Sequence, residues 1–283
     1  MNYKQQILSM ESQVLRHNHT GIDDFDGLTP VNMQALLYSP LKDKCMIQLN
    51  AMEQCDYDQV PILRLAHLIT NEISISSEIK LTATGNLPPK IVKEIYAASG
   101  FIDDMIESGI VKITKESDVK SITQTRIILD LAGITKVRNG KLSLTKSGAT
   151  IIQDDPKLLA HIFDTFGSKV NWCYFDGYPE NDAGRLGFAF TMVMLGKYGN
   201  ESRSDKFYSE KYYRAFPDII DQFPENSYSP KHDAAYRCFS LRTFERFLKY
   251  FGVIDIQGKF YQNKTEIKTN ILFTKMIRIN FAN

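Results

Sequence analysis

Hydrophobic positions recur along much of the chain at the three- and four-residue spacing of an amphipathic helix. Shorter stretches alternate apolar and polar residues, the pattern of a half-buried strand. We therefore expect a mainly α protein with short β-hairpins. The predicted helices are residues 3–16, 30–38, 62–69, 90–98, 122–131, 154–166, 183–198, 204–216, 218–223, 233–239 and 241–251, and the predicted strands are residues 79–84, 110–114, 135–138, 253–256, 259–262 and 271–279.

One sequence pattern occurs twice in the chain. Residues 62–85 and 128–148 each run from an apolar helix end into a strand that stops at Thr-x-(Ser/Thr)-Gly. The second copy contains Asn139-Gly140, the strongest short signal for a hairpin, because a type I′ turn needs a positive φ at both central residues. After residue 231, two short helices divided by Ser240 as an N-cap again precede a hairpin. This order is typical of a winged helix-turn-helix.

The repeats predict winged helix-turn-helix-like modules joined by a helical middle segment. At 283 residues the chain is long enough for two domains or for three small modules. The expected segments are an N-terminal helical region at 1–57, winged-helix-like units at 58–117 and 118–155, a helical middle segment at 156–230, and a basic C-terminal winged-helix-like module at 231–283.

Composition places the chain among soluble globular proteins. The hydrophobic share of 43% and the charged share of 24% are both ordinary for that class. No stretch approaches the roughly 18 apolar residues of a membrane span, and the first residues lack the apolar run of a signal peptide. We therefore expect a cytoplasmic protein with no membrane partner. Its four scattered cysteines form no C-x-x-C pair, which argues against a zinc ribbon or a disulfide framework.

Positive charge is concentrated at the C-terminal end. Residues 231–283 contain ten Lys or Arg and four acids, a net charge of +6, so the segment 1–230 carries −5. In the predicted helix 241–251, Arg242, Arg246 and Lys249 recur at helical spacing opposite an apolar face, as in a helix that offers Arg to phosphates or guanine edges. The alternative is a solvated helix face that is basic by chance. The predicted nucleic-acid-binding residues are Arg237, Arg242, Arg246, Lys249, Lys259 and Lys264.

A polar loop near the N-terminus is a candidate metal site. His17, His19, Asp23, Asp24 and Asp26 crowd ten positions, and imidazoles and carboxylates at such spacing can ligate a divalent ion. The loop lacks the third oxygen ligand and the bidentate Glu of a Ca²⁺ loop. Asx side chains that bond their own backbone explain the same residues, so we predict a turn without metal.

A second candidate for chemistry is a metal-dependent nuclease site. Glu266-x-Lys268 is expected on one strand, and Asp255 lies eleven residues upstream at the end of another. In a metal-dependent nuclease, two carboxylates on adjacent strands hold Mg²⁺ and the Lys steadies the attacking water. Glu78-x-Lys80 repeats the tripeptide, which shows how easily it arises by chance. The sequence contains no GxSxG, HExxH, Walker or GxGxxG motif, and we predict no cofactor.

Three strings in the sequence carry a resemblance to a known family. DGLTPVNMQALLYSP at 26–40, IKLTATGNLPPKIVKEIY at 79–96 and NWCYFDGYPE at 171–180 are similar to pieces of a family of uncharacterised bacterial proteins. Some members of that family carry extra Cys/His metal-binding domains, and the Cys/His-rich tail is missing from this sequence. The resemblance implies a cytoplasmic bacterial protein with winged-helix-like modules, and it implies no reaction.

These observations favour a non-enzymatic function. We expect a nucleic-acid-associated or regulatory protein that contacts double-stranded DNA most directly through the C-terminal module, where the charge lies. Two alternatives remain open. One is a protein-interaction adaptor that uses its winged modules to hold a protein partner, and the other is the nuclease described above.

Overall fold

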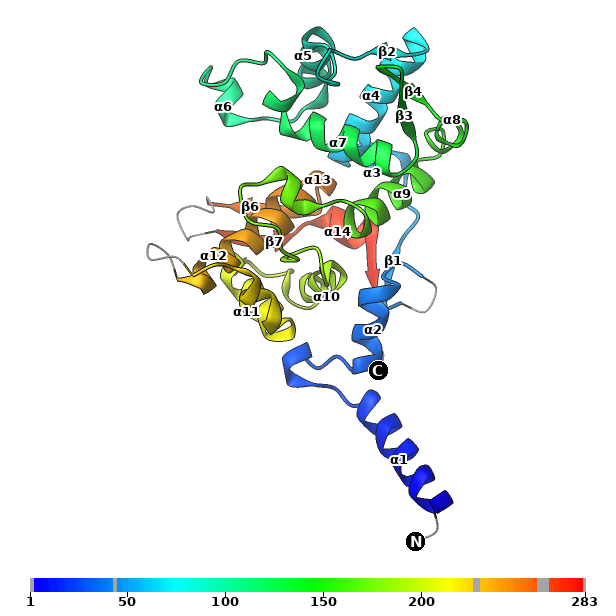
Figure 1. Ribbon diagram of the computed structural model, residues 1–283, viewed down its shortest axis with the longest axis vertical. Coiled ribbons are helices and arrows are strands. Elements are labelled where there is room, and N and C mark those ends of the chain that lie inside the picture. Colours follow the sequence, from blue (N-terminus) through cyan, green and yellow to red (C-terminus); the bar gives the residue numbers. More distant parts are fainter. Residues whose placement is uncertain (1–2, 43–44, 226–229, 259–264, 282–283) are drawn as a thin grey trace. The chain divides into compact units, whose positions relative to one another are not determined.

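The computed structural model describes residues 3–42, 45–225, 230–258 and 265–281 (Figure 1). The chain divides into two compact units that interleave in the sequence. Unit 1 comprises residues 1–50, 178–245 and 254–283, and unit 2 comprises residues 51–177 and 246–253. Helices predominate, and the strands of the described residues form three small antiparallel sheets. The expectation of a mainly α protein with short hairpins is confirmed.

Unit 2 is organised around the long helix α4 (Pro61–Ser76). Pro61 occupies the first helical position, where its missing N–H leaves no hydrogen bond unmade. The helix extends a full turn and more beyond the expected 62–69, because Ile73 continues its buried apolar face. The other elements of this unit are α3 (Gln54–Tyr57), β2 (Ile79–Lys80), α5 (Pro89–Ser99), α6 (Asp104–Glu107), η2 (Glu116–Asp118), α7 (Lys120–Leu131), β3 (Thr135–Arg138), β4 (Lys141–Leu144), α8 (Lys146–Ile151), α9 (Asp155–Ser168), η3 (Trp172–Phe175) and α13 (Lys249–Phe251).

The two copies of the sequence repeat contribute to one sheet. Strand β2 comes from the first copy, β3 and β4 come from the second, and the three pair antiparallel in the order β2-β4-β3. Asn139 and Gly140 have φ values of 52° and 68°, so the predicted hairpin turn with two positive φ angles is confirmed. Ile79 and Leu142 lie opposite each other and are buried, which fixes the register of the sheet against the helices.

Aromatic side chains form much of the core of unit 2. Phe163 and Phe166 of α9 contact Phe247 and Phe251, with ring centroids 4.8–6.0 Å apart. Trp172 packs on Phe166 and Phe247, and its indole N–H donates to the carbonyl of Phe166 at 2.8 Å. The short segment 246–253 therefore completes a core whose other residues all come from the segment 51–177.

Unit 1 contains the other two sheets. Strands β5, β7 and β6 pair in that order, and β1 pairs with β8, which lies near the opposite end of the sequence. The elements are α1 (Tyr3–Asn18), η1 (Asp23–Phe25), α2 (Pro30–Tyr38), β1 (Ile47–Leu49), α10 (Phe188–Tyr198), β5 (Arg203–Ser204), α11 (Asp205–Ala215), η4 (Pro217–Gln222), α12 (Lys231–Ser240), β6 (Ile254–Gln257), β7 (Glu266–Thr269), α14 (Ile271–Met276) and β8 (Ile277–Ile279).

The three-stranded sheets share one element order. In each, a helix precedes a first short strand, further helical segments follow, and a hairpin ends the series with its second strand in the centre of the sheet. The first series runs from α4 to β4 and the second from α10 to β7. Both pair antiparallel throughout. The structural repeat is therefore longer than the repeat seen in the sequence.

Three local predictions are wrong. Ser240 starts no new helix, because α12 continues through a π-helical segment, η5 (Leu241–Leu248), into α13. Residues 110–114, all of them described, contain no strand. Of the strand expected at 271–279, the first six residues are helical, because the side chain of Asn270 accepts from the backbone N–H groups of Leu272 and Phe273 and so caps α14.

The polar loop after α1 is held by the side chain of Asp26. Its carboxylate accepts hydrogen bonds from Nζ of Lys211, from Nζ of Lys197 at 3.1 Å and from the hydroxyl of Tyr198 at 2.8 Å. Burial raises the pKa of this carboxyl, but the three hydrogen bonds outweigh burial and hold the pKa below its ordinary value of 3.8. The residues proposed as metal ligands therefore include one that anchors the loop to α10 and α11.

Replacing Asp26 with asparagine is expected to lower the free energy of unfolding at pH 7 by about 1–3 kcal/mol, because charge-assisted hydrogen bonds are lost. A carboxyl whose pKa is lowered in the folded state stabilises above its unfolded pKa, and this stabilisation disappears as the pH falls through the folded value. Urea unfolding of both proteins between pH 7 and pH 2.5 measures this. The difference between them should shrink below pH 3.8. Asp24→Asn, an exposed neighbour, should show no such trend.

Candidate functional site

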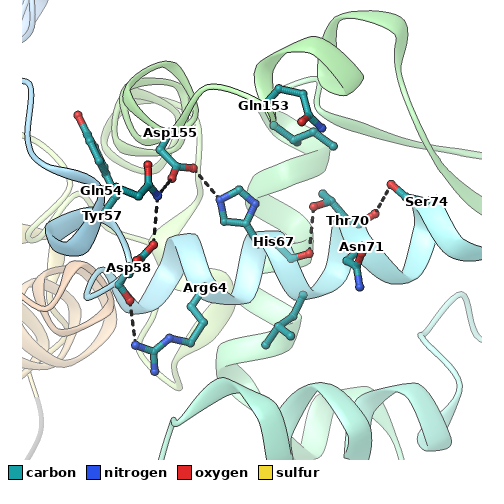
Figure 2. Close-up of a pocket in the computed structure, with 12 residues that line it drawn as sticks. Gln54, Tyr57, Asp58, Arg64, His67, Thr70, Asn71, Ser74, Gln153 and Asp155 are labelled. Carbon is teal, nitrogen blue, oxygen red and sulfur yellow. Dashed lines mark hydrogen bonds and ion pairs between the residues drawn. The ribbon is translucent and has the colours of Figure 1, made fainter.

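A polar stripe runs along one face of α4. Arg64, His67, Asn71 and Ser74 follow one another at spacings of three and four residues, so they share a face, while Ile62, Leu65, Ile69 and Ile73 of the same helix are buried. This stripe lines a recess of about 790 Å³ within unit 2, which Figure 2 shows from the side of α4. The remaining lining comes from α4 itself, from α3 and its C-terminal end, and from the junction of α8 and α9: Gln54, Tyr57, Asp58, Leu68, Thr70, Ile152, Gln153 and Asp155.

A histidine–aspartate pair crosses the recess. Nε2 of His67 lies 2.7 Å from Oδ1 of Asp155, in the first turn of α9 (Figure 2). An ionised carboxylate can only accept, so Nε2 of His67 carries a proton and donates to Asp155. Nδ1 has no hydrogen-bond partner among the described residues. The His67 side chain is 42% exposed and that of Asp155 is 15% exposed, so the pair is open to a ligand from the side of the histidine.

A single amide joins two carboxylates at one end of the recess. Nε2 of Gln54 donates to Oδ2 of Asp155 at 2.7 Å and to Oδ1 of Asp58 at 3.1 Å (Figure 2). The guanidinium of Arg64 donates instead to the carbonyl oxygens of Ser99 and Asp58, at 3.2 and 2.9 Å. Arg64 thus closes the C-terminal end of α5, and two of its five N–H groups are used by the fold.

The outer face of the sheet β2-β4-β3 is basic. Lys80, Lys141 and Arg138 lie directly opposite one another on the three strands, and Lys136 lies on the same face one step along β3. We call these four exposed residues the basic face. One acid, Glu78, pairs with Lys141 through Nζ and Oε1. Like charges directly opposite each other destabilise a sheet, so folding alone does not favour this row.

The sheet of the same topology in unit 1 differs in its charges. Asp255 lies opposite Lys268, and Glu266 lies opposite Gln257. Asp255 and Glu266 of the nuclease hypothesis are therefore on one face, together with Lys268. Among the described residues there is no group of three His, Cys, Asp or Glu side chains able to hold a metal ion.

Arg242 does not face solvent. It is fully buried, and its Nη1 donates to Oδ1 of Asn181 at 2.6 Å and to the carbonyl oxygens of Asn181 and Ala183 at 3.1 and 3.3 Å. The segment η5 is π-helical, so the spacing of an α-helix does not apply and the expected basic stripe is not formed there. Arg242 cannot reach a phosphate, which corrects its place in the predicted set.

The other predicted cations are divided between the units. Arg237 is exposed on α12 in unit 1, and Lys249 is exposed on α13 in unit 2. Arg246 is partly buried, and its carbonyl accepts from Nε2 of Gln124 on α7 at 2.8 Å. Lys259 and Lys264 lie outside the described residues. The described members of the predicted set therefore belong to different units.

The residues of the basic face and of the recess were not among those predicted. For the basic face a signal exists in the sequence, because Lys136, Arg138 and Lys141 alternate with apolar residues around Asn139-Gly140 and so belong to one face of the hairpin. Lys80 joins them only through the pairing of β2 with β4, which are distant in the sequence. No local signal places His67 beside Asp155, since they lie on separate helices.

Comparison with known proteins identifies one segment. Residues 58–157 match the model of a family described as the Y4jL N-terminal domain. The Y4jL-like segment lies inside unit 2 and spans both predicted modules, 58–117 and 118–155, together with the basic face and most of the recess. Its description states no activity, in keeping with the expected resemblance to an uncharacterised family. No curated protein and no solved structure matches the chain.

Within the described ranges, no helix is long and apolar enough to cross a membrane.

Proposed function

We propose that this chain is a non-enzymatic, nucleic-acid-associated protein that contacts the phosphates of a duplex through the basic face of unit 2. The observation that carries the proposal is the row formed by Lys80, Lys141 and Arg138. Lysines on edge strands commonly prevent sheets from pairing with one another, but Lys141 is on the central strand, where no edge needs protection. A polyanion would relieve the repulsion within this row.

The element order of the segment supports this proposal. Helix α4, strand β2, helices α5 and α7, and the hairpin β3-β4 follow the order of a winged helix-turn-helix, and the strand order β2-β4-β3 agrees with it. In that interpretation α7 corresponds to the recognition helix and the hairpin to the wing. The basic face then lies on the wing.

The burial of α7 defines the kind of contact. Ser121, Gln124 and Thr125 are buried, and Arg126 of the same helix donates from Nε to the buried carboxylate of Glu116 at 2.6 Å. Reading bases in a major groove requires exposed polar side chains on the inserted helix. We therefore propose contact with phosphates by the wing, without reading of base edges by α7. Such binding depends strongly on salt and weakly on sequence.

Fluorescence anisotropy with a labelled duplex, titrated at several KCl concentrations, tests the proposal. The logarithm of the binding constant should fall linearly with the logarithm of the salt concentration. The variant Lys80→Gln/Arg138→Gln/Lys141→Gln should bind more weakly and lose about one unit of slope for each phosphate contact removed. A second duplex of unrelated sequence should bind similarly.

The matched control is Lys268→Gln, on the central strand of the other three-stranded sheet, where the lysine faces an acid. This variant should bind as the native protein does. Circular dichroism establishes that the triple variant is folded. Native protein that fails to bind any duplex at low salt, or a triple variant that binds as tightly as Lys268→Gln, would contradict the proposal.

A different surface supports the adaptor alternative. The segment between α5 and α7 exposes Ile102, Met105 and Ile110, at 74%, 48% and 69%, beside the acids Asp103 and Asp104. Exposed apolar side chains grouped in one segment are typical of surfaces that bind protein. A stoichiometric protein partner that remains bound after nuclease treatment, and is lost from Ile102→Ser/Ile110→Ser, would favour this function.

A further inference from the structure

The recess along α4 shares no lining residue with the basic face. Its floor is the stripe of Arg64, His67, Asn71 and Ser74, and its wall is formed by Gln153 and Asp155 (Figure 2). A volume of about 790 Å³ falls in the range of small-molecule sites, about 300–1,000 Å³. Its chemistry can be read from the hydrogen bonds that its lining residues already make.

Part of the donor capacity of the lining is engaged by the protein itself. Arg64 uses two of its five N–H groups on backbone carbonyls, and the amide of Gln54 donates to both carboxylates. Nε2–H of His67 is directed at Asp155. The hydroxyls of Thr70 and Ser74 donate to carbonyls of the preceding turn of α4, at 2.8 and 2.9 Å. The donors that stay open to a ligand include the other N–H groups of Arg64 and the amides of Asn71 and Gln153.

Acceptors remain. Oδ2 of Asp58 accepts no hydrogen bond from the described residues, and the hydroxyl oxygen of Ser74 keeps lone pairs free. The amides of Asn71 and Gln153 can each offer a carbonyl oxygen. A ligand that supplies N–H or O–H donors can bond to these acceptors.

The charges of the lining favour a positively charged ligand. The carboxylates of Asp58 and Asp155 face one cation, the guanidinium of Arg64, so the charges of these three residues sum to one negative charge. We infer that the recess binds an organic amine, with an ammonium group at Asp58 and further N–H groups toward Asn71 and Ser74. The stripe from residue 64 to residue 74 spans about 15 Å along the helix, which suits an extended aliphatic polyamine.

An alkylammonium group could come from a free polyamine or from a lysine side chain. Isothermal titration calorimetry with the full chain, at constant ionic strength and without nucleic acid, separates the two when spermidine and N-acetyl-lysine amide are the probes. Saturable binding of spermidine that is tighter than that of putrescine is expected for a free polyamine. Tighter binding of the lysine derivative would assign the site to a protein side chain and still support an amine site.

Asp58→Asn should weaken binding about tenfold or more, because it removes a charge and an acceptor with little change of shape. Asn71→Ala should weaken it by a smaller factor with no change of charge. The control Asp130→Asn, an exposed acid on α7 outside the recess, should bind as the native protein does. Absence of saturable binding by either probe, or equal losses in Asp58→Asn and Asp130→Asn, would overturn the inference. Because no nucleic acid is present, this result is independent of the duplex-binding proposal.

Discussion

Replacing Glu116 with alanine is expected to lower the free energy of unfolding by about 3–5 kcal/mol. The carboxylate is fully buried and accepts from Nε of Arg126 and from the backbone N–H of Leu87, both at 2.6 Å. Through these two bonds it joins the segment before α5 to helix α7. Its removal leaves a guanidinium and an amide in the interior without their acceptor, which costs far more than a surface pair contributes.

Urea unfolding followed by the fluorescence of Trp172 measures this effect. Trp172 is the single tryptophan of the chain and is buried in unit 2, as Glu116 is. The control is Glu94→Ala, which removes an exposed pair with Lys90 at 3.9 Å and should change stability by about 0.5 kcal/mol or less. The double variant Glu116→Ala/Arg126→Ala should cost less than the sum of the single variants. If Glu116→Ala unfolds at the same urea concentration as Glu94→Ala, the hydrogen bonds of Glu116 do not stabilise the fold as proposed.

Replacing Arg242 with alanine is expected to lower the free energy of unfolding by about 3–5 kcal/mol, and to do so without a direct effect on nucleic-acid binding. The side chain is fully buried, and its guanidinium hydrogen-bonds to one side-chain oxygen and two backbone carbonyls. Alanine leaves a cavity and unpaired acceptors around Asn181. The guanidinium that was predicted to lie on a nucleic-acid-binding face is instead buried in the interior.

Urea unfolding followed by far-ultraviolet circular dichroism measures the loss, and Arg237→Ala is the matched control. Arg237 lies on the same continuous helix but is exposed, so its removal should change stability by about 0.5 kcal/mol or less. At a temperature where Arg242→Ala is folded, its affinity for a duplex should equal that of the native protein. If Arg242→Ala is stably folded but has lost duplex binding, the result would restore the hypothesis that Arg242 contacts nucleic acid.

Local signals in the sequence predicted local structure well. The helix expected at residues 30–38 is α2, which begins after a capping box at Thr29, and Asn139-Gly140 forms the predicted hairpin turn. Each of these depends on a few neighbouring residues whose backbone preferences are strong. The presence of most helices and the fold class could be predicted as well, because hydrophobic periodicity also depends on residues that are close together in the sequence.

The candidate sites could not be predicted in the same way, because they depend on distant pairings. The row of cations exists because β2 pairs with β4 from the other copy of the repeat, and the His67–Asp155 pair spans 88 positions. Periodicity also cannot tell whether a basic helix face is covered by another part of the chain. Arg242 is covered and Lys249 is exposed, although they belong to one predicted stripe.

The pairing of β1 with β8 sets a condition on the folding of a nascent chain. Residues 47–49 form their strand with residues 277–279. At ordinary rates of synthesis the ribosome needs roughly 10–50 s to make the intervening chain. During that time β1 has no strand to pair with, and an unpaired strand is a site for association with other chains. Slower translation of the last third of the message should therefore lower the soluble fraction of the product, while the stability of the finished protein stays the same.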